Sequence, residues 1–166
     1  ISSIVNKIAC SLSAQTIVVV GSHKNEIKAE LSAFDLHFVY NEKFEEGMLS
    51  SVQAGIAAID QETNGMLIFL GDQPMVSQVV INRLISVFQK TEKGLLVPTF
   101  KGKRGHPVLI SSKYKNQIKN INPEVGLREL FFNNSADILE IEVDFENVLK
   151  DIDTPEDYKR ETRNKF

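Results

Sequence analysis

The chain of 166 residues is long enough for one domain with a substantial hydrophobic core. Its 19 basic and 22 acidic side chains give a net charge of −3, which argues against a partner that is nucleic acid or a membrane surface. The single cysteine excludes an internal disulfide framework and a multi-cysteine metal site. No apolar run approaches membrane-spanning length and the first residues lack the layout of a signal peptide, so we expect a cytoplasmic protein.

Helix-type and strand-type patterns alternate through the first half of the chain. Apolar residues at helical spacing predict a helix over residues 2–13, and a continuous apolar run predicts a buried strand over residues 16–20. A second helix over 24–33 and a strand over 37–40 follow. After an acidic loop, Ser50 and Gln53 have the spacing of a capping box, which predicts that a helix begins at Ser50 and continues to about Ile59.

The central element of the chain is the run from Met66 to Leu70. Its residues are apolar without polar alternation, which is typical of a strand buried on both faces. Gly71 allows a sharp exit, and Asp72 then stands at the carboxyl end of the strand. Ligands bind at that edge of an open α/β sheet, so we expect Asp72 to hold Mg²⁺, although a loop aspartate can also simply cap a turn.

The second half continues the alternation and ends on an acidic turn. The predicted elements are helices over 76–89, 112–120 and 125–133, strands over 95–98, 107–110 and 138–143, and a last helix with Pro155 at its first position. This order predicts an α/β fold of three α/β/α layers around a mostly parallel sheet. The chain opens on a helix and contains no glycine-rich phosphate-binding motif.

A second carboxylate is expected from the acidic turn before the last helix, at Asp151 or Asp153. The same residues also suit an ordinary helix start, and spacing does not separate the two interpretations. The scattered histidines and lone cysteine leave no soft-metal site, so a hard divalent cation is the consistent ligand.

Two further loops contain candidate ligand contacts. Residues 101–107 are locally basic, and His106 lies between Gly105 and Pro107 just before a strand, which favours a phosphate-binding role over a solvated hairpin tip. The stretch 46–51 offers backbone N–H groups and hydroxyls at a helix N-terminus, suited to a base edge or an anion. A capping box alone would explain Ser50 there, but it would not explain Gly47.

Four of these stretches, taken in order, resemble a known family. They are Asn41 with Glu46-Gly47-Met48-Leu49-Ser50-Ser51, then Gly71-Asp72-Gln73-Pro74, Arg104-Gly105-His106-Pro107, and Asp151-Ile152-Asp153-Thr154-Pro155. The sequence is similar to the molybdenum-cofactor nucleotidyltransferases (MobA/MocA-like NTP transferases), and more so to the cytidylyltransferase branch than to the guanylyltransferase branch.

The resemblance implies a fold of the nucleotide-diphospho-sugar transferase type, with residues 1–166 as one domain. It also implies Mg²⁺-dependent transfer of a nucleoside monophosphate, from CTP more readily than from GTP, to a molybdopterin-type acceptor. A molybdoenzyme is a further partner that the resemblance suggests. The implied site residues are Asp72 and Asp153 at the metal, Asn41, Gly47, Ser50, Ser51 and Gly71 at the nucleotide, and Arg104, His106 and Arg128 at the acceptor, with His106 also counted as catalytic.

The resemblance also implies an initial strand and a triphosphate-binding loop that these residues do not contain. We therefore expect the domain to be incomplete at its N-terminus. Two alternatives stay open: a nucleotidyltransferase that acts on a sugar or polyol phosphate, and a non-catalytic protein that binds or delivers the molybdenum cofactor.

Overall fold

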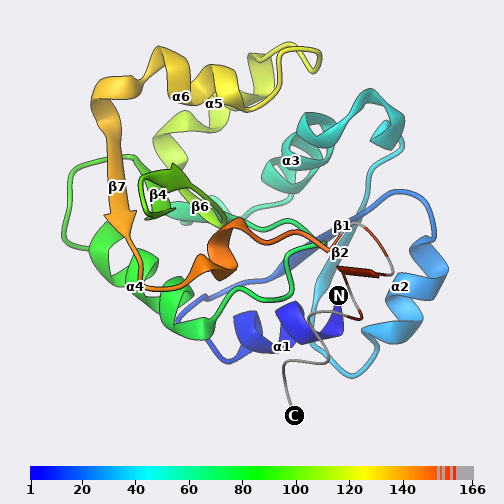
Figure 1. Cartoon of the computed structure of the whole chain (residues 1–166). Coiled ribbons are helices and arrows are strands. Elements are labelled where there is room, and N and C mark those ends of the chain that lie inside the picture. Colours follow the sequence, from blue (N-terminus) through cyan, green and yellow to red (C-terminus); the bar gives the residue numbers. More distant parts are fainter. Residues whose placement is uncertain (153, 155, 158, 160–166) are drawn as a thin grey trace.

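The computed structural model describes residues 1–152, 154, 156–157 and 159 (Figure 1). The α-helices are α1 (Ser2–Ala9), α2 (Lys24–Glu30), α3 (Met48–Ala57), α4 (Gln78–Phe88), α5 (Lys115–Asn120) and α6 (Arg128–Asn133). The strands are β1 (Ile17–Val20), β2 (His37–Tyr40), β3 (Gly65–Ile68), β4 (Leu95–Phe100), β5 (Lys103–Arg104), β6 (Val108–Ser111) and β7 (Ile138–Glu142). The 3₁₀ turns are η1 (Phe44–Glu46), η2 (Ser112–Tyr114), η3 (Ser135–Asp137) and η4 (Glu146–Leu149).

Helices cover both faces of the central strands, with α3, α5 and α6 above and α1 and α4 below in Figure 1. Successive residues of a strand point to opposite faces. Leu95 and Val97 of β4 accordingly join a core with α3, α5 and α6, whereas Leu96 between them joins a core with α4. The predicted α/β architecture with helices on both faces is therefore present.

The prediction of a mostly parallel sheet is wrong for the larger sheet. In that five-stranded sheet, β6 lies between β3 and β4 and is antiparallel to both; only β7 pairs in parallel, with β4. The cause is the β4–β5 hairpin, whose central residues Lys101 and Gly102 both have positive φ angles, 51° and 75°. Such turns reverse the chain within two residues, and the stretch from β4 to β6 has no helix that could return it in parallel.

The remaining two strands form a separate small sheet. β1 and β2 are parallel and in register from Ile17 opposite His37 to Val20 opposite Tyr40. Within the described chain no ladder joins β1 to β3, so each of these strands has one edge without a partner strand.

The six helices predicted before residue 134 exist, but several are shorter than expected; Pro155, the predicted start of the last helix, falls outside the described residues. The first ends at Ala9 rather than at residue 13, because the hydroxyls of Ser11 and Ser13 donate to the carbonyl of Ile8 and take up its acceptor capacity. Leu12 is consequently exposed, and so is Cys10. None of the helices that can be described is long and apolar enough to cross a membrane.

Candidate functional site

Asp72 lies in the loop that leaves β3, as predicted. The amide of Gln73 donates to the carbonyl of Leu70 at 3.2 Å, which closes a turn immediately after the strand. The side chain of Asp72 is exposed, and a side chain in place of Gly71 would meet nothing within 4 Å. The loop therefore offers a carboxylate beside open space, as ligand binding requires.

The acidic turn near the C-terminus meets this loop. The amide of Ile152 donates to the backbone carbonyl of Asp72 at 2.8 Å, and the side-chain amide of Gln73 donates to the carboxylate of Asp151. The two acidic stretches, distant in sequence, thus come together at one edge of the sheet. Asp153 itself falls outside the described residues, and its role as a metal ligand stays a prediction.

His106 lies against the same two stretches. Its amide donates to the carbonyl of Val148 at 2.9 Å, and a Cβ on Gly105 would stand only 2.2 Å from that carbonyl oxygen, so the close approach needs a glycine there. Burial lowers the pKa of His106, while a hydrogen bond with the backbone of Ile68 and the charges of Asp151 and Asp72 oppose that shift. The imidazole is therefore neutral at neutral pH.

We call Asp72, Gln73, His106 and Asp151 the Asp72 cluster. Two of its buried atoms, Oε1 of Gln73 and Nδ1 of His106, have no hydrogen-bond partner among the residues that the structure describes. Unpaired buried polar atoms are rare in native proteins, and each calls for an explanation. Local sequence assigned Gln73 no role other than that of the residue before Pro74. It left Asp151 as an alternative to Asp153 for the second carboxylate.

Most of the potential metal ligands in the cluster are oxygen atoms. The carboxylates of Asp72 and Asp151 and the unpaired carbonyl oxygen of Gln73 are the kind of ligand that Mg²⁺ and Mn²⁺ prefer. Among the residues described, no group of three or more acidic, histidine or cysteine side chains is arranged to enclose a metal. The cluster therefore fits a hard cation that shares its coordination with a ligand and with water, rather than a closed structural site.

The predicted nucleotide contacts form a hydrogen-bonded network at the start of α3. The side-chain amide of Asn41 donates to the hydroxyls of Ser50 and Ser51 at 2.8 and 3.0 Å, and Ser50 in turn donates to the carbonyls of Lys43 and Gly47. Ser50 is buried, so its hydroxyl holds the loop together, whereas Ser51 is half-buried. The structure thus brings Asn41, Ser50 and Ser51 together as expected from the motif.

The capping box predicted for this helix is wrong. The helix begins at Met48, and its N-cap is Gly47, which has φ 101° and ψ 178°, a conformation that only glycine adopts readily. Gln53 points elsewhere, because its side-chain amide donates to the carbonyls of Ile118 in α5 and of Ile121 just after it. The backbone requirement at the helix start explains Gly47, which a capping box could not.

The two predicted arginine contacts are engaged in other interactions. Arg104 forms an ion pair with Glu140 on β7, with 2.7 Å between its terminal nitrogen and the carboxylate. Arg128, at the start of α6, donates to the carbonyl of Val125. The contacts found within the described chain do not join either side chain to the Asp72 cluster, so their roles at the acceptor stay predictions.

A cavity of 610 Å³ lies between the unpaired edges of β1 and β3. Its walls include β1, the run from Gly65 to Gly71, and apolar residues of α1 such as Ile4 and Ile8. Ser51 and Gly71, two of the predicted nucleotide contacts, also line it. The cavity therefore borders both the gap between β1 and β3 and the residue before Asp72.

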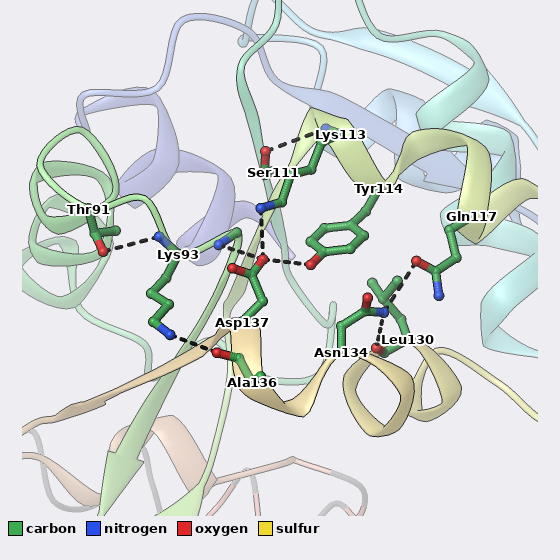
Figure 2. Close-up of polar contacts among 11 residues, drawn as sticks. Thr91, Lys93, Ser111, Lys113, Tyr114, Gln117, Leu130, Asn134, Ala136 and Asp137 are labelled. Atoms are coloured by element: carbon green, nitrogen blue, oxygen red, sulfur yellow. Dashed lines mark hydrogen bonds and ion pairs between the residues drawn. The ribbon is translucent and has the colours of Figure 1, made fainter.

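A second polar group, the Asp137 corner, comprises Gly94, Lys113, Tyr114 and Asp137. Figure 2 shows the carboxylate of Asp137 accepting three hydrogen bonds, from the Tyr114 hydroxyl at 2.5 Å, the Lys113 ammonium at 2.9 Å and the Gly94 amide at 3.0 Å. Burial and the bond to Asp137 raise the pKa of Tyr114 to about 12. Burial alone would raise the pKa of Asp137, but its three donors outweigh that effect and lower it.

The Asp72 cluster and the Asp137 corner lie at opposite ends of the strands of the larger sheet. Because β3 and β4 are both antiparallel to β6, they point the same way, and β7 is parallel to β4. Asp72 follows the carboxyl end of β3, whereas Gly94 and Asp137 precede the amino ends of β4 and β7. The Asp72 cluster therefore lies where the carboxyl end of β3 is, which is the side of an open α/β sheet where ligands bind, and the Asp137 corner lies at the opposite ends of the strands.

Comparisons with known proteins bear on the family and the fold of the chain. The profile of the MobA-like NTP transferase domain matches residues 3–138. The molybdenum cofactor cytidylyltransferase of Escherichia coli is 24% identical over 153 residues, which are 92% of this chain and 76% of that protein.

Solved structures show the same fold. Rv0371c from Mycobacterium tuberculosis, in complex with manganese, superposes with a TM-score of 0.81 at 23% identity, covering 96% of this chain and 83% of that one. The 4-diphosphocytidyl-2C-methyl-D-erythritol synthase of Anaerococcus prevotii superposes with a TM-score of 0.78 at 14% identity, covering 98% and 83%. The chain therefore has the α/β fold of nucleotidyltransferases.

Proposed function

The chain belongs to the MobA-like NTP transferase family, and on that premise we propose that it transfers CMP from CTP to a molybdopterin-type acceptor and releases pyrophosphate. The observation that carries the proposal is the hydrogen bond from Ile152 to Asp72, because it brings the Gly-Asp-Gln-Pro loop and the C-terminal acidic turn to one edge of the sheet. The similarity to the cytidylyltransferase of Escherichia coli favours CTP and this acceptor.

In the proposed reaction, a phosphate oxygen of the acceptor attacks the α-phosphorus of CTP in line. A bond forms between that oxygen and the α-phosphorus, the bond from the α-phosphorus to the bridging oxygen breaks, and pyrophosphate leaves with the electron pair. The acceptor phosphate is already ionised near neutral pH, so no general base is needed. The chemistry is then mainly positioning and charge stabilisation.

The side chains of the chain divide this task. Asp72, together with Asp151 or Asp153, would hold a divalent cation, which when bound neutralises negative charge on the phosphates. The Asn41–Ser51 network and the N-terminus of α3 would line the nucleotide. His106, neutral and half-buried beside both acidic stretches, would contact the reacting phosphates as a hydrogen-bonding group rather than as a charge.

A panel of substrates tests the proposal. Purified protein is incubated with CTP, GTP or UTP and Mg²⁺, with molybdopterin, a sugar phosphate or a polyol phosphate as acceptor, and pyrophosphate release is measured. We expect release with CTP and molybdopterin. Release only with a polyol phosphate would show that the acceptor is a polyol phosphate rather than molybdopterin. That outcome would agree with the fold shared with the 4-diphosphocytidyl-2C-methyl-D-erythritol synthase.

A non-catalytic delivery protein is the remaining alternative. Such a protein need not bind a nucleotide, whereas a transferase must. Calorimetry with Mg²⁺–CTP separates the two, and absence of binding together with absence of pyrophosphate release would favour delivery of the cofactor over its synthesis.

We also propose that an additional strand completes the domain between β1 and β3. The cavity there is bordered by two unpaired strand edges and by apolar side chains, as a site for β-strand addition would be. We expect the occupant to be a strand that precedes residue 1 in a longer chain. Hydrogen exchange of protein with and without the preceding residues of its reading frame tests this, since slower exchange of β1 and β3 amides is expected only with the strand.

A further inference from the structure

The segment Val148–Ile152, which we call the strap, is fastened to both loops of the Asp72 cluster. The carbonyl of Val148 accepts from the amide of His106, and the amide of Ile152 donates to the carbonyl of Asp72. Between these backbone links, the side chain of Gln73 donates to the carboxylate of Asp151. Gln73 therefore decides where the carboxylate of Asp151 points.

Gln73 is an unusual choice if its task were only to fill space. The residue is 4% exposed, and within the described chain its Oε1 has no partner although its Nε2 has one. An unpaired buried acceptor destabilises the folded state, and an apolar side chain of similar shape would avoid that loss. The carbonyl oxygen is therefore best explained by a donor that arrives with a ligand.

The position of the donor follows from the surroundings. Two carboxylates adjoin Gln73: that of Asp151 accepts from its amide nitrogen, and Asp72 precedes it in the chain. Magnesium-type cations keep several of their waters when they bind to one or two carboxylates, and those waters are hydrogen-bond donors. Groups that hydrogen-bond to metal ligands from behind orient them and tune affinity.

We propose that Gln73 is a positioning residue for the divalent cation: its Nε2 orients the Asp151 carboxylate, and its Oε1 accepts a hydrogen bond from a cation-bound water. The inference rests on the proposed function, because it assumes that the Asp72 cluster takes a cation. It adds Gln73 to the residues that act on that cation.

The experiment compares two glutamine variants. Gln73→Met removes both amide interactions at similar volume, and Gln53→Met removes an amide that also bridges two segments but lies against the carbonyls of Ile118 and Ile121. Mn²⁺ alone is titrated into each protein and free Mn²⁺ is followed by electron paramagnetic resonance. We expect Gln73→Met to bind Mn²⁺ about 10–100-fold more weakly than wild type and Gln53→Met to match wild type.

Each result has one meaning. Affinity of Gln73→Met within twofold of wild type would overturn the inference, as would wild-type protein that binds no Mn²⁺ at millimolar concentration. If Gln73→Met does not fold, Gln73→Asn replaces it, since the shorter amide keeps its polarity but withdraws from Asp151. Pyrophosphate release is measured on the same samples, so a wild type that binds Mn²⁺ but transfers no nucleotide refutes the proposed function separately.

Discussion

The Asp72 cluster and the Asp137 corner hold carboxylates at opposite edges of one sheet, and they differ in how completely their polar atoms are paired. In the Asp137 corner the carboxylate receives three hydrogen bonds, and all of its donors come from the chain itself (Figure 2). In the Asp72 cluster, Gln73 and His106 each keep a buried atom to which no described residue is hydrogen-bonded. A fully paired network stabilises the fold, whereas unpaired atoms beside an exposed carboxylate indicate a place prepared for a ligand.

The largest expected effect is on turnover, at Asp72. Asp72→Asn should lower the rate of pyrophosphate release at least about a hundredfold, because a preorganised charge at the reacting phosphates is lost. The side chain is exposed, so the free energy of unfolding should change by less than about 0.5 kcal/mol. Urea denaturation and the release assay measure the two quantities, and retained activity would refute the role of Asp72.

At the Asp137 corner the expected effect is on stability instead. Asp137→Ala leaves the Tyr114 hydroxyl and the Gly94 amide without their acceptor, so the free energy of unfolding should fall by about 1–3 kcal/mol. The rate per folded molecule should stay at the wild-type value. The control is Asp144→Ala, at an exposed position, and equal losses of stability in the two variants would contradict the distinction drawn here.

Tyr114 offers a smaller effect that depends on alkaline pH. Tyr114→Phe should cost about 1 kcal/mol at pH 7, since one hydrogen bond to a carboxylate is lost. In the folded protein the pKa of Tyr114 is raised from 10.0 to about 12, so its contribution is fully present below pH 10 and is lost as the pH rises through 12. The difference in unfolding free energy between wild type and variant should therefore shrink above pH 10, and a constant difference from pH 8 to 12 would be the opposing result.

The smallest expected effect is at Lys113, whose ion pair with Asp137 is half-exposed. Lys113→Gln should cost less than about 1 kcal/mol at pH 7. Because the donors around Asp137 lower its pKa below the usual 3.8, this contribution is present above that value and is lost as the pH falls through the lowered pKa. Urea titrations from pH 7 to 2 are the measurement, because guanidinium chloride is a salt and would screen the ion pair. A cost of Lys113→Gln that grows on acidification would contradict the prediction.

Much of the candidate site could be recognised from local sequence. An apolar run followed by Gly71 and Asp72 places a carboxylate at the end of a core strand, and both features act within a few residues. The strand of residues 37–40 was also predicted from local sequence, and its observed bounds are the predicted ones. Gly47 could be singled out as unexplained by a capping box, and the backbone conformation that only glycine readily adopts accounts for it.

Other features depend on contacts that no local pattern reports. The sequence pattern of alternating strands and helices suggested parallel strands, but the two-residue hairpin at Lys101 and Gly102 reverses the chain and makes β6 antiparallel. Gln53 matched a capping box, yet its amide binds carbonyls more than 60 residues away. A side chain with several possible partners follows the packing of the whole chain rather than its spacing to a neighbour.

By itself the sequence determined the α/β class and the carboxylate at the end of the central strand, because apolar periodicity and turn-forming residues act over short distances. The family followed from the resemblance of four short motifs, and the match of residues 3–138 to the MobA-like domain confirms it. Only the tertiary structure decided that Gln73 meets Asp151, 78 residues later, and that Tyr114 meets Asp137 at the other edge. Hydrogen bonds between distant segments form where two backbones are brought close by the burial of many other side chains, and that proximity is a property of the folded chain.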